Sequence, residues 1–100
     1  MGNGPLSIGK NVMMGPEVMI ITREHKTDIS EVPMIQQGYE APKPTTIGDD
    51  VFIGARVVIT CGVFLGAHSV VGAGTVVTKD IPEYSFVAGS PFRIIRSRST

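Results

Sequence analysis

A six-residue period governs most of the chain. Written in sixes from Ile8, the sequence reads IGKNVM, MGPEVM and IITREH, and after an interruption it resumes as IGDDVF, IGARVV, ITCGVF, LGAHSV, VGAGTV and VTKDIP. The first place is apolar in every repeat, and glycine fills the second place except in every third repeat. This exception predicts a larger unit of eighteen residues, in which three short strands and three tight turns wind once around a triangular cross-section.

The first and fifth places of the repeat predict the interior. The first place must point into a common core, and the fifth place carries small or β-branched residues that stack well between coils, with Glu24 as the exception. We expect glycine at the second place because the backbone turns there with an unusual φ angle. The pattern predicts an all-β fold, a parallel β-helix of about three coils over residues 8–25, 47–64 and 65–82. At roughly 4.8 Å per coil, this prism is only about 14 Å tall.

Residues 26–46 interrupt the repeat. Ile47 follows Ile8 by thirty-nine residues, which is not a multiple of six, so this segment must leave the prism and return in a new phase. Three prolines, Pro33, Pro42 and Pro44, disfavour continued coiling. An extruded loop of this size is either functional or a tolerated surface insertion, and the sequence leaves both interpretations open.

The period fades after Pro82. We expect a last strand around Ser85 to Ala88, a turn at Gly89, Ser90 and Pro91, and a short basic segment that caps the β-helix. Because the strand edges at the ends of so short a stack lie unpaired, we also expect association or further coils. We interpret residues 1–100 as a single domain, truncated at its N-terminus.

Composition and charge narrow the class of protein. Hydrophobic residues make up 42% of the chain and the formal net charge is zero, which is typical of a globular domain and does not indicate a nucleic-acid partner. The sequence contains no apolar run of the roughly 18 residues that a membrane span needs, and it has no secretory signal pattern. A cytoplasmic location is therefore the expectation. The single cysteine, Cys61, excludes an internal disulfide framework.

Several motifs resemble one family. The segment "VGAGTVVTKDIP", followed by "VAGSP" and a basic end, resembles the hexapeptide-repeat acyltransferases of the maltose, galactoside and polysaccharide O-acetyltransferase type, over residues 8–96. The segment from Arg23 to Gly54 looks most like enzymes that acetylate sugars in capsule or exopolysaccharide synthesis. The resemblance implies a left-handed β-helix, a homotrimer, and transfer of an acetyl group from acetyl-CoA to the hydroxyl of a sugar or polysaccharide.

The resemblance assigns the chemistry to His25. In the family, a histidine at the end of a coil, immediately before the extruded loop, is the general base. A sugar hydroxyl is a poor nucleophile at neutral pH, and an imidazole can remove its proton as it attacks the thioester carbonyl, which is worth about 10²–10⁴-fold in rate. In the predicted register, His25 ends the third side of the first coil and stacks above Phe64 and Pro82.

Three further residues match positions near the family's active site. Phe52 lies where relatives usually carry a tryptophan that packs beside the reacting groups, although ordinary packing at a coil corner would also explain an aromatic residue there. Ala55 and Ala73 match positions at which backbone groups hold the pantetheine arm of coenzyme A. Their small size is the relevant property.

The C-terminal part supplies the expected contacts to the nucleotide end of coenzyme A. Thr78, Lys79, Arg93 and Arg96 match these positions in relatives. Coenzyme A carries three phosphates, and guanidinium groups bind phosphate oxygens through paired donors. The alternative is that "RIIRSR" is only a solvated basic end.

The sequence gives less support to three other kinds of site. Cys61 could accept an acyl group, but in the predicted register it lies on the order of 10 Å from His25. A zinc site of the carbonic anhydrase type needs three histidines, whereas the chain has only His25 and His68, so we expect no metal. The stretch "VGAGTV" lacks the third glycine of a dinucleotide fingerprint.

A non-catalytic scaffold is the alternative function. Relatives supply an asparagine and an acidic residue that contact the acceptor sugar, and by counting back from His25 both positions would precede Met1. Their absence from the chain favours the scaffold, whereas a histidine at the loop boundary opposes it.

Overall fold

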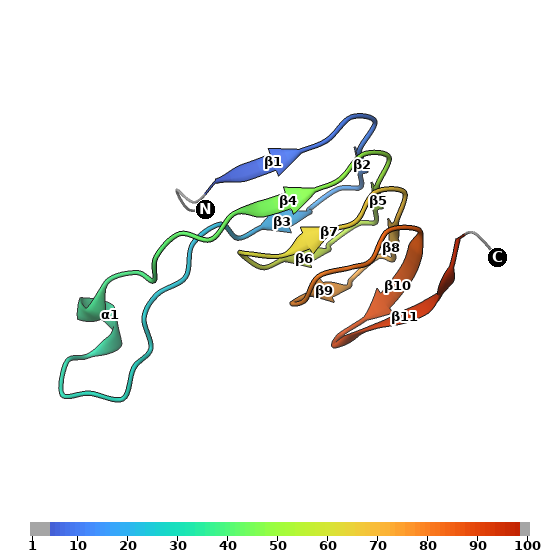
Figure 1. Cartoon of the computed structure of the whole chain (residues 1–100). Coiled ribbons are helices and arrows are strands. Elements are labelled where there is room, and N and C mark those ends of the chain that lie inside the picture. The colour runs from blue at the N-terminus through green and yellow to red at the C-terminus, as the bar shows by residue number, and fades with distance from the viewer. Residues whose placement is uncertain (1–4, 99–100) are drawn as a thin grey trace.

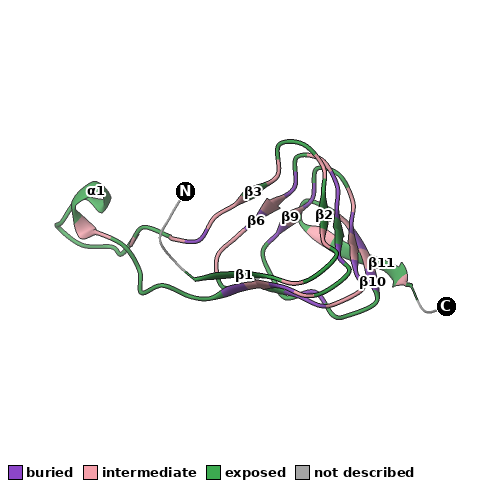
Figure 2. Cartoon of the chain, turned by 90° about the horizontal axis from the view of Figure 1, so that it is seen from above, coloured by how far each residue is buried: buried purple, intermediate pink, exposed green. Residues whose placement is uncertain are grey.

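Three β-sheets, parallel except for one antiparallel edge strand, form the sides of a triangular prism (Figures 1 and 2). The computed structural model describes residues 5–98, so the two ends of the predicted domain lie outside the described residues. Face A contains β1 (Leu6–Ile8), β4 (Thr45–Ile47) and β7 (Phe64–Leu65). Face B contains β2 (Met13–Met14), β5 (Phe52–Ile53), β8 (Val70–Val71), β10 (Ser85–Gly89) and β11 (Phe92–Ser97). Face C contains β3 (Met19–Ile20), β6 (Val58–Ile59) and β9 (Val76–Val77).

The strand register confirms the predicted parallel β-helix. On face A, Ile47 pairs with both Ile8 and Leu65, so first-place side chains lie directly above one another. Face C repeats this arrangement, with Ile59 paired to Ile20 and to Val77. The predicted steps of thirty-nine and eighteen residues between coils are therefore the observed ones.

The last coil is shorter than the repeat predicts. Leu65 forms its bridge with Ile81, sixteen residues later, so the predicted coil 65–82 is wrong at its end and closes two residues early. The reason is a tighter corner after β9, at which the Asp80 carboxylate accepts a hydrogen bond from the Phe64 backbone N–H at 2.9 Å. Ile81 thereby enters the core at a first-place position instead of the fifth.

The core is a stack of inward-facing aliphatic side chains whose burial ends at the first coil. Ile47 is 1% exposed and Ile53 is fully buried, whereas Ile8 and Met14 above them are 47% and 39% exposed (Figure 2). Within residues 5–98, the first coil packs against another coil on one side only, so its inward side chains are less covered than those of the later coils. The buried core comprises Ile47, Val51, Ile53, Val57, Ile59, Val63, Leu65, Val71, Val77, Ile81 and Val87.

Glycine is required at the second place of the repeat for a reason other than the expected one. Positive φ angles occur at the fourth place of the repeat, for example 60° at Asn11 and 58° at Arg56, so the expectation of an unusual φ at the second place was wrong. A Cβ atom at Gly54 would instead lie 2.6 Å from the backbone nitrogen of Ala73. Glycine is needed there because the next coil packs against the backbone itself.

The extruded loop, called here the loop 23–44, projects away from the prism (Figure 1). It begins three residues before the predicted segment 26–46. It ends two residues before the predicted end, because Thr45 and Thr46 already belong to β4. Its tip contains a single helical turn, α1 (Met34–Gln37), which the all-β prediction did not include. Its two legs meet in an antiparallel neck, where Glu40 N donates to Glu24 O at 2.8 Å and Lys26 N donates to Gly38 O at 3.0 Å.

The C-terminal hairpin confirms the expected strand and turn. β10 adds to face B in parallel, and β11 returns antiparallel to it, so the hairpin extends one face of the prism. The end of β11 is held by a cluster at the corner between faces A and B. Arg98 donates to the carbonyl oxygen of His68 at 2.7 Å, and His68 Nδ1 lies 2.9 Å from Asp50 Oδ2. Within residues 5–98, no helix is long and apolar enough to cross a membrane.

Candidate functional site

His25 lies on the neck of the loop 23–44 and not on the prism. The last backbone hydrogen bond between the first two coils on face C runs from Ile21 N to Ile59 O, at 2.8 Å. Beyond it the chain pairs with its own loop, and His25 forms an antiparallel bridge with Tyr39. The expected stacking of His25 above Phe64 was therefore wrong, since Phe64 pairs with Thr46. The histidine still follows the first coil closely, and its side chain is exposed.

Tyr39 and an apolar cavity flank the imidazole. The two rings are stacked, with centroids 4.2 Å apart and an angle of 29° between their planes. The guanidinium of Arg23 lies 3.9 Å from the centre of the Tyr39 ring, a cation–π contact that helps fix the tyrosine. A shallow cavity of about 320 Å³ opens beside the histidine, lined by His25, Thr27, Met34 and Ile35. Sequence reasoning did not find these neighbours, whose only signal is their apolar or aromatic character within a largely polar loop.

Ala55 and Ala73 form a column at the corner between faces B and C. They occupy equivalent turns of successive coils, and Gly74 N donates to Ala55 O at 2.8 Å. Arg93 continues this corner in the C-terminal hairpin, because it pairs with Ala88, whose Cβ would lie 3.2 Å from a Cβ at Gly72. Arg93 also lines a cavity of about 570 Å³ formed with the hairpin turn. The two alanines and one predicted arginine are thus brought together.

Phe52 and Arg96 lie on the outer surface of face B. Register places Phe52 beside Val70, Val70 beside Phe86, and Phe86 beside Arg96, so all four side chains share one row. The Arg96 guanidinium lies 4.8 Å from the centre of the Phe86 ring. Phe52 is 43% exposed and lies outside the buried core.

Thr78 and Lys79 lie at a different corner, between faces C and A. They follow β9 directly and are exposed. The loop 23–44 leaves the prism from this same corner, two coils away, which corresponds to about 10 Å along the prism axis. Six of the predicted residues therefore fall into two groups that flank face C, whereas Phe52 and Arg96 lie on face B. His25, Thr78 and Lys79 lie at one edge, and Ala55, Ala73 and Arg93 lie at the other.

The predicted phosphate-binding cations are not engaged in ion pairs. Among residues 5–98, Arg56 pairs with Glu17, and both His68 and Arg98 pair with Asp50. Lys79, Arg93 and Arg96 take part in none of these. Their charges are available for the phosphates of a ligand.

Cys61 is not an activated nucleophile. Burial, reinforced by a hydrogen bond with Glu24, raises the pKa of its thiol above the ordinary value. The thiol is therefore protonated at neutral pH, whereas the thiolate is the reactive form. The other histidine, His68, belongs to the cluster with Asp50 and Arg98, and no group of three or more metal-ligating side chains occurs among residues 5–98.

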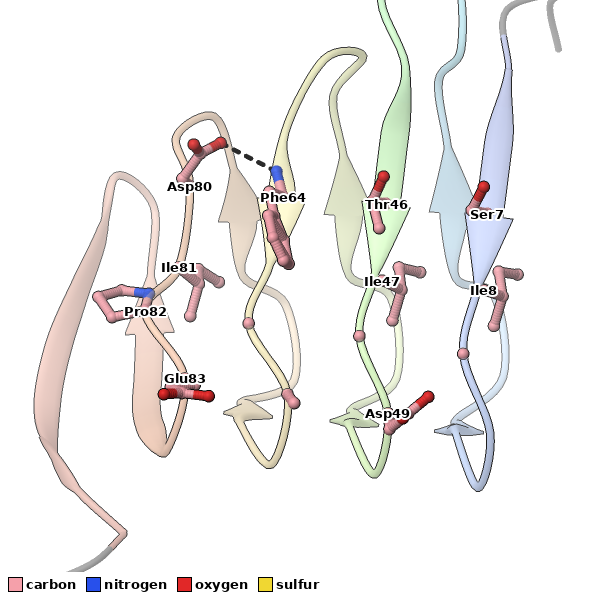
Figure 3. Close-up of a pocket in the computed structure, with 14 residues that line it drawn as sticks. Ser7, Ile8, Thr46, Ile47, Asp49, Phe64, Asp80, Ile81, Pro82 and Glu83 are labelled. Atoms are coloured by element: carbon pink, nitrogen blue, oxygen red, sulfur yellow. Dashed lines mark hydrogen bonds between the residues drawn. The ribbon is translucent and has the colours of Figure 1, made fainter.

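A wider cavity of about 730 Å³ runs along face A (Figure 3). Phe64, Thr46 and Ser7 lie along it, but none of the predicted catalytic or coenzyme-binding residues lines it. Two of its carboxylates are engaged by the backbone, since Asp80 accepts from Phe64 N and Asp49 accepts from Lys10 N at 2.8 Å. The chemistry-bearing side chains therefore point to the edges of face C as the candidate site, although the cavity on face A is larger.

Comparison with known proteins gives one consistent result. A family profile described as the hexapeptide repeat of succinyl-transferase matches residues 44–79. The galactoside O-acetyltransferase of Escherichia coli is 42% identical over 91 residues, which are 91% of this chain and 43% of that enzyme. A hexapeptide-repeat-containing acetyltransferase from Vibrio cholerae, solved in complex with acetyl coenzyme A, is 43% identical with a TM-score of 0.83 over 93% of this chain and 49% of the other.

A further structure of such a Vibrio cholerae acetyltransferase is 33% identical with a TM-score of 0.76, and the match covers 96% of this chain and 69% of that one. The chain spans less than half the length of the galactoside O-acetyltransferase of Escherichia coli and less than half the length of the first solved structure. These matches confirm the expected left-handed parallel β-helix. The chain belongs to the hexapeptide-repeat acyltransferase family.

Proposed function

We propose that the protein transfers an acetyl group from acetyl-CoA to a sugar hydroxyl, with His25 as the general base. The observation that carries the proposal is the division of the candidate residues between the two edges of face C. The chain crosses face C from the turn at Ala73, through β9, to Thr78, so within one copy His25 lies across this face from Ala55 and Ala73. Contact between copies would bring the two edges together.

A homotrimer with face C turned toward the threefold axis would complete the site. The outward residues of this face are apolar, since Met19, Val58 and Val76 share one row and Met19 is 55% exposed. A sheet face that meets water is normally polar, and an apolar outer face is typical of an interface. Threefold symmetry makes each copy's C/A corner meet the next copy's B/C corner. His25 of one copy would then approach Ala55 and Ala73 of the next.

The reaction follows as a direct transfer. The His25 imidazole accepts the proton of the sugar hydroxyl while the oxygen attacks the thioester carbonyl carbon. The resulting oxyanion is stabilised by hydrogen-bond donors, for which backbone N–H groups at the coil corners are suited. The C–S bond then breaks, the acetyl ester is formed, and the imidazolium returns its proton to the departing thiolate of coenzyme A.

Coenzyme A would lie along the corner column. The methyl side chains of Ala55 and Ala73 leave room for a narrow pantetheine arm beside the backbone. Arg93, Arg96, Lys79 and the hydroxyl of Thr78 would contact the phosphate and nucleotide end, because their charges are not used elsewhere in ion pairs. Phe52 would pack beside the reacting groups from its exposed position on face B. The proposal includes a cytoplasmic location, where acetyl-CoA is available.

The acceptor is proposed from the relatives. The similarity to the galactoside O-acetyltransferase of Escherichia coli supports a sugar, and the resemblance of residues 23–54 to capsule and exopolysaccharide enzymes supports a saccharide of polysaccharide synthesis as the finer assignment. The loop 23–44 stands beside His25 and would form one wall of the acceptor site.

The test follows free thiol as the protein is incubated with acetyl-CoA and a panel of sugars. We expect thiol release that depends on a sugar and falls about 10²–10⁴-fold in His25→Ala. His68→Ala is the matched control and should retain activity, because His68 lies at another corner. Undiminished turnover in His25→Ala would exclude the general base. Absence of both thiol release and acetyl-CoA binding would favour the non-catalytic scaffold, and a fully active monomer in sedimentation would exclude the shared site.

A further inference from the structure

Tyr39 lies against the candidate base, and its contacts point to a role in the reaction. We infer that Tyr39 is a positioning residue that holds the plane of the His25 imidazole, and that Arg23 in turn holds Tyr39. The tyrosine hydroxyl has no part in the chemistry. The inference rests on the proposed function of His25, and it identifies the side chains that give a base on a loop a fixed orientation.

A base on the neck of the loop needs support that the prism does not supply. The chain leaves face C after the bond from Ile21 N to Ile59 O, so the backbone at His25 pairs with the loop itself. The other histidine, His68, is oriented by the Asp50 carboxylate, whose Oδ2 lies 2.9 Å from Nδ1 of the imidazole. Within residues 5–98, no carboxylate forms such a pair with the imidazole of His25. Its orientation therefore depends on another kind of contact.

The strand pairing at the neck places Tyr39 directly against His25. Backbone hydrogen bonds of 2.8 Å and 3.0 Å join the residues that flank these two on the legs of the neck. The bridge between His25 and Tyr39 is therefore a non-hydrogen-bonded pair of antiparallel strands. In such a pair the Cα atoms are only about 4.5 Å apart and the side chains share one face. The centroids of the two rings accordingly lie 4.2 Å apart.

The stack restrains the plane of the imidazole and leaves its edge free. The planes of the two rings differ by 29°, so the tyrosine covers a face of the imidazole, whereas the ring nitrogens lie at its edge. A general base must aim one nitrogen at the hydroxyl proton, and a misplacement of about 1 Å can cost about 10²-fold in rate. The contact lies within one copy, so it does not depend on how copies associate.

Arg23 holds Tyr39 from the start of the loop. The carbon of its guanidinium lies 3.9 Å from the centre of the Tyr39 ring, a distance at which a cation is attracted to an aromatic ring. Because Arg23 precedes His25 by two residues, their side chains project to the same side of an extended chain, where both can reach Tyr39. Arg23 is half-buried, whereas His25 and Tyr39 are exposed. The stack is therefore anchored at its more buried end.

The first experiment separates the ring of Tyr39 from its hydroxyl by measuring kcat and KM with acetyl-CoA and a galactoside. We expect Tyr39→Phe to stay within about twofold of the parent protein, because the stack needs only the ring. In Tyr39→Leu we expect kcat to fall by about 10²-fold, with both KM values changed by less than about threefold. Tyr84→Leu is the matched control and should leave kcat unchanged, because Tyr84 stacks on His68, with centroids 4.7 Å apart.

Three kinetic results would overturn the inference while the proposed function stands. The first is equal kcat in Tyr39→Leu and the parent protein. The second is a loss in Tyr39→Phe as large as in Tyr39→Leu, because the hydroxyl would then be the acting group. The third is a change confined to the KM of the galactoside, which would make Tyr39 an acceptor-binding residue. Undiminished turnover in His25→Ala would instead exclude the proposed function, and the inference with it.

A double-mutant cycle tests Arg23. If the arginine acts only through Tyr39, Arg23→Gln should lower kcat several-fold in the parent protein and cause no further loss in Tyr39→Leu. Arg23→Lys, which keeps the cation, should retain more of kcat than Arg23→Gln. Equal losses from Arg23→Gln in the two backgrounds would overturn the role of Arg23.

A spectroscopic measurement tests the stack without acetyl transfer. In protein with isotope-labelled histidine, we follow the ring C–H signals of His25 by NMR and use those of His68 as an internal reference. An aromatic ring stacked on an imidazole shifts these signals upfield. We expect the shift at His25 to be lost in Tyr39→Leu and retained in Tyr39→Phe. Unshifted His25 signals in the parent protein would overturn the inference, because the two rings would then not be stacked in solution.

Discussion

The prism and the loop 23–44 are stabilised in different ways. In the prism, a residue at a given place of the repeat has equivalent neighbours in successive coils, and the inward side chains of the second and third coils are almost completely buried. The helical turn of the loop has no buried residue, and a few hydrogen bonds hold its tip. The candidate base nevertheless lies on the loop side of the boundary. Stability and chemistry therefore reside in adjoining parts of this small chain, as is common when a rigid scaffold carries functional loops.

The largest effect is expected from a single methyl group in the prism. In Gly54→Ala, the new Cβ would lie 2.6 Å from the nitrogen and 2.9 Å from the Cα of Ala73, and backbone atoms cannot move aside cheaply. We expect a loss of about 3 kcal/mol or more in the free energy of unfolding, measured by chemical denaturation. Gly38→Ala is the control in the loop, where nothing lies within 4 Å of the added Cβ.

Gly38 has a φ of 84°, at which any added side chain is strained even in open space, but this strain lies in the loop, which can open without the prism. We therefore expect Gly38→Ala to lower the global free energy of unfolding by less than Gly54→Ala does. Equal losses in the free energy of unfolding of the two variants would mean that the prism and the loop unfold as one unit.

A second variant should disturb the loop and spare the prism. Gln37→Ala removes three hydrogen bonds that hold the tip, each worth roughly 0.5–1.5 kcal/mol locally. We expect amide hydrogen exchange over residues 28–38 to become at least about tenfold faster, with the melting temperature nearly unchanged and acetyl transfer reduced several-fold. Gln36→Ala is the matched control, because the adjacent glutamine makes no side-chain bond of this kind. A large fall in melting temperature in Gln37→Ala would contradict the separation.

The C-terminal cluster should give a small, pH-dependent effect on the prism. The hydrogen bond from His68, followed by the charges of His68 and Arg98, lowers the pKa of Asp50 below its ordinary value of 3.8. Because the folded-state pKa is depressed, the stabilisation is present above pH 3.8 and is lost as the pH falls through the folded value. We expect Asp50→Asn to lower the melting temperature slightly at about pH 5, and this difference to shrink as the pH falls through the lowered folded-state pKa of Asp50. If the difference in melting temperature between Asp50→Asn and the parent protein grew on acidification, the assigned direction of the Asp50 pKa shift would be wrong.

The smallest effect is expected at Cys61. Its raised pKa keeps the thiol protonated at neutral pH, so Cys61→Ser should leave the rate of acetyl transfer within about twofold of the parent protein. A rate that fell as far as in His25→Ala would indicate an acyl-thiol intermediate and exclude direct transfer. Steady-state kinetics with acetyl-CoA and the best acceptor would decide between these mechanisms.

The sequence by itself determined the prism, because the period of six repeats one environment many times. Ile47, Ile53 and Ile59 are buried for the same reason, and their spacing is visible without knowledge of any contact. The position of Ala55 and Ala73 at one common corner could also be anticipated from the sequence. The two residues are eighteen positions apart, which is one full coil, so they must stack. Matching motifs then assigned the family, and these inferences depend only on repetition along the chain.

Tertiary structure alone decided where the repeat fails. Whether His25 ends a coil or begins a loop depends on a competition between pairing with the second coil and pairing with Tyr39, and no period records that outcome. The shortened last coil similarly depends on the Asp80 carboxylate reaching a backbone N–H of the previous coil. The apolar wall of Met34 and Ile35 beside His25 arises because the loop folds back on itself. Each of these features is set by contacts between residues that lie at no regular spacing along the chain. They are therefore evident only in the tertiary structure.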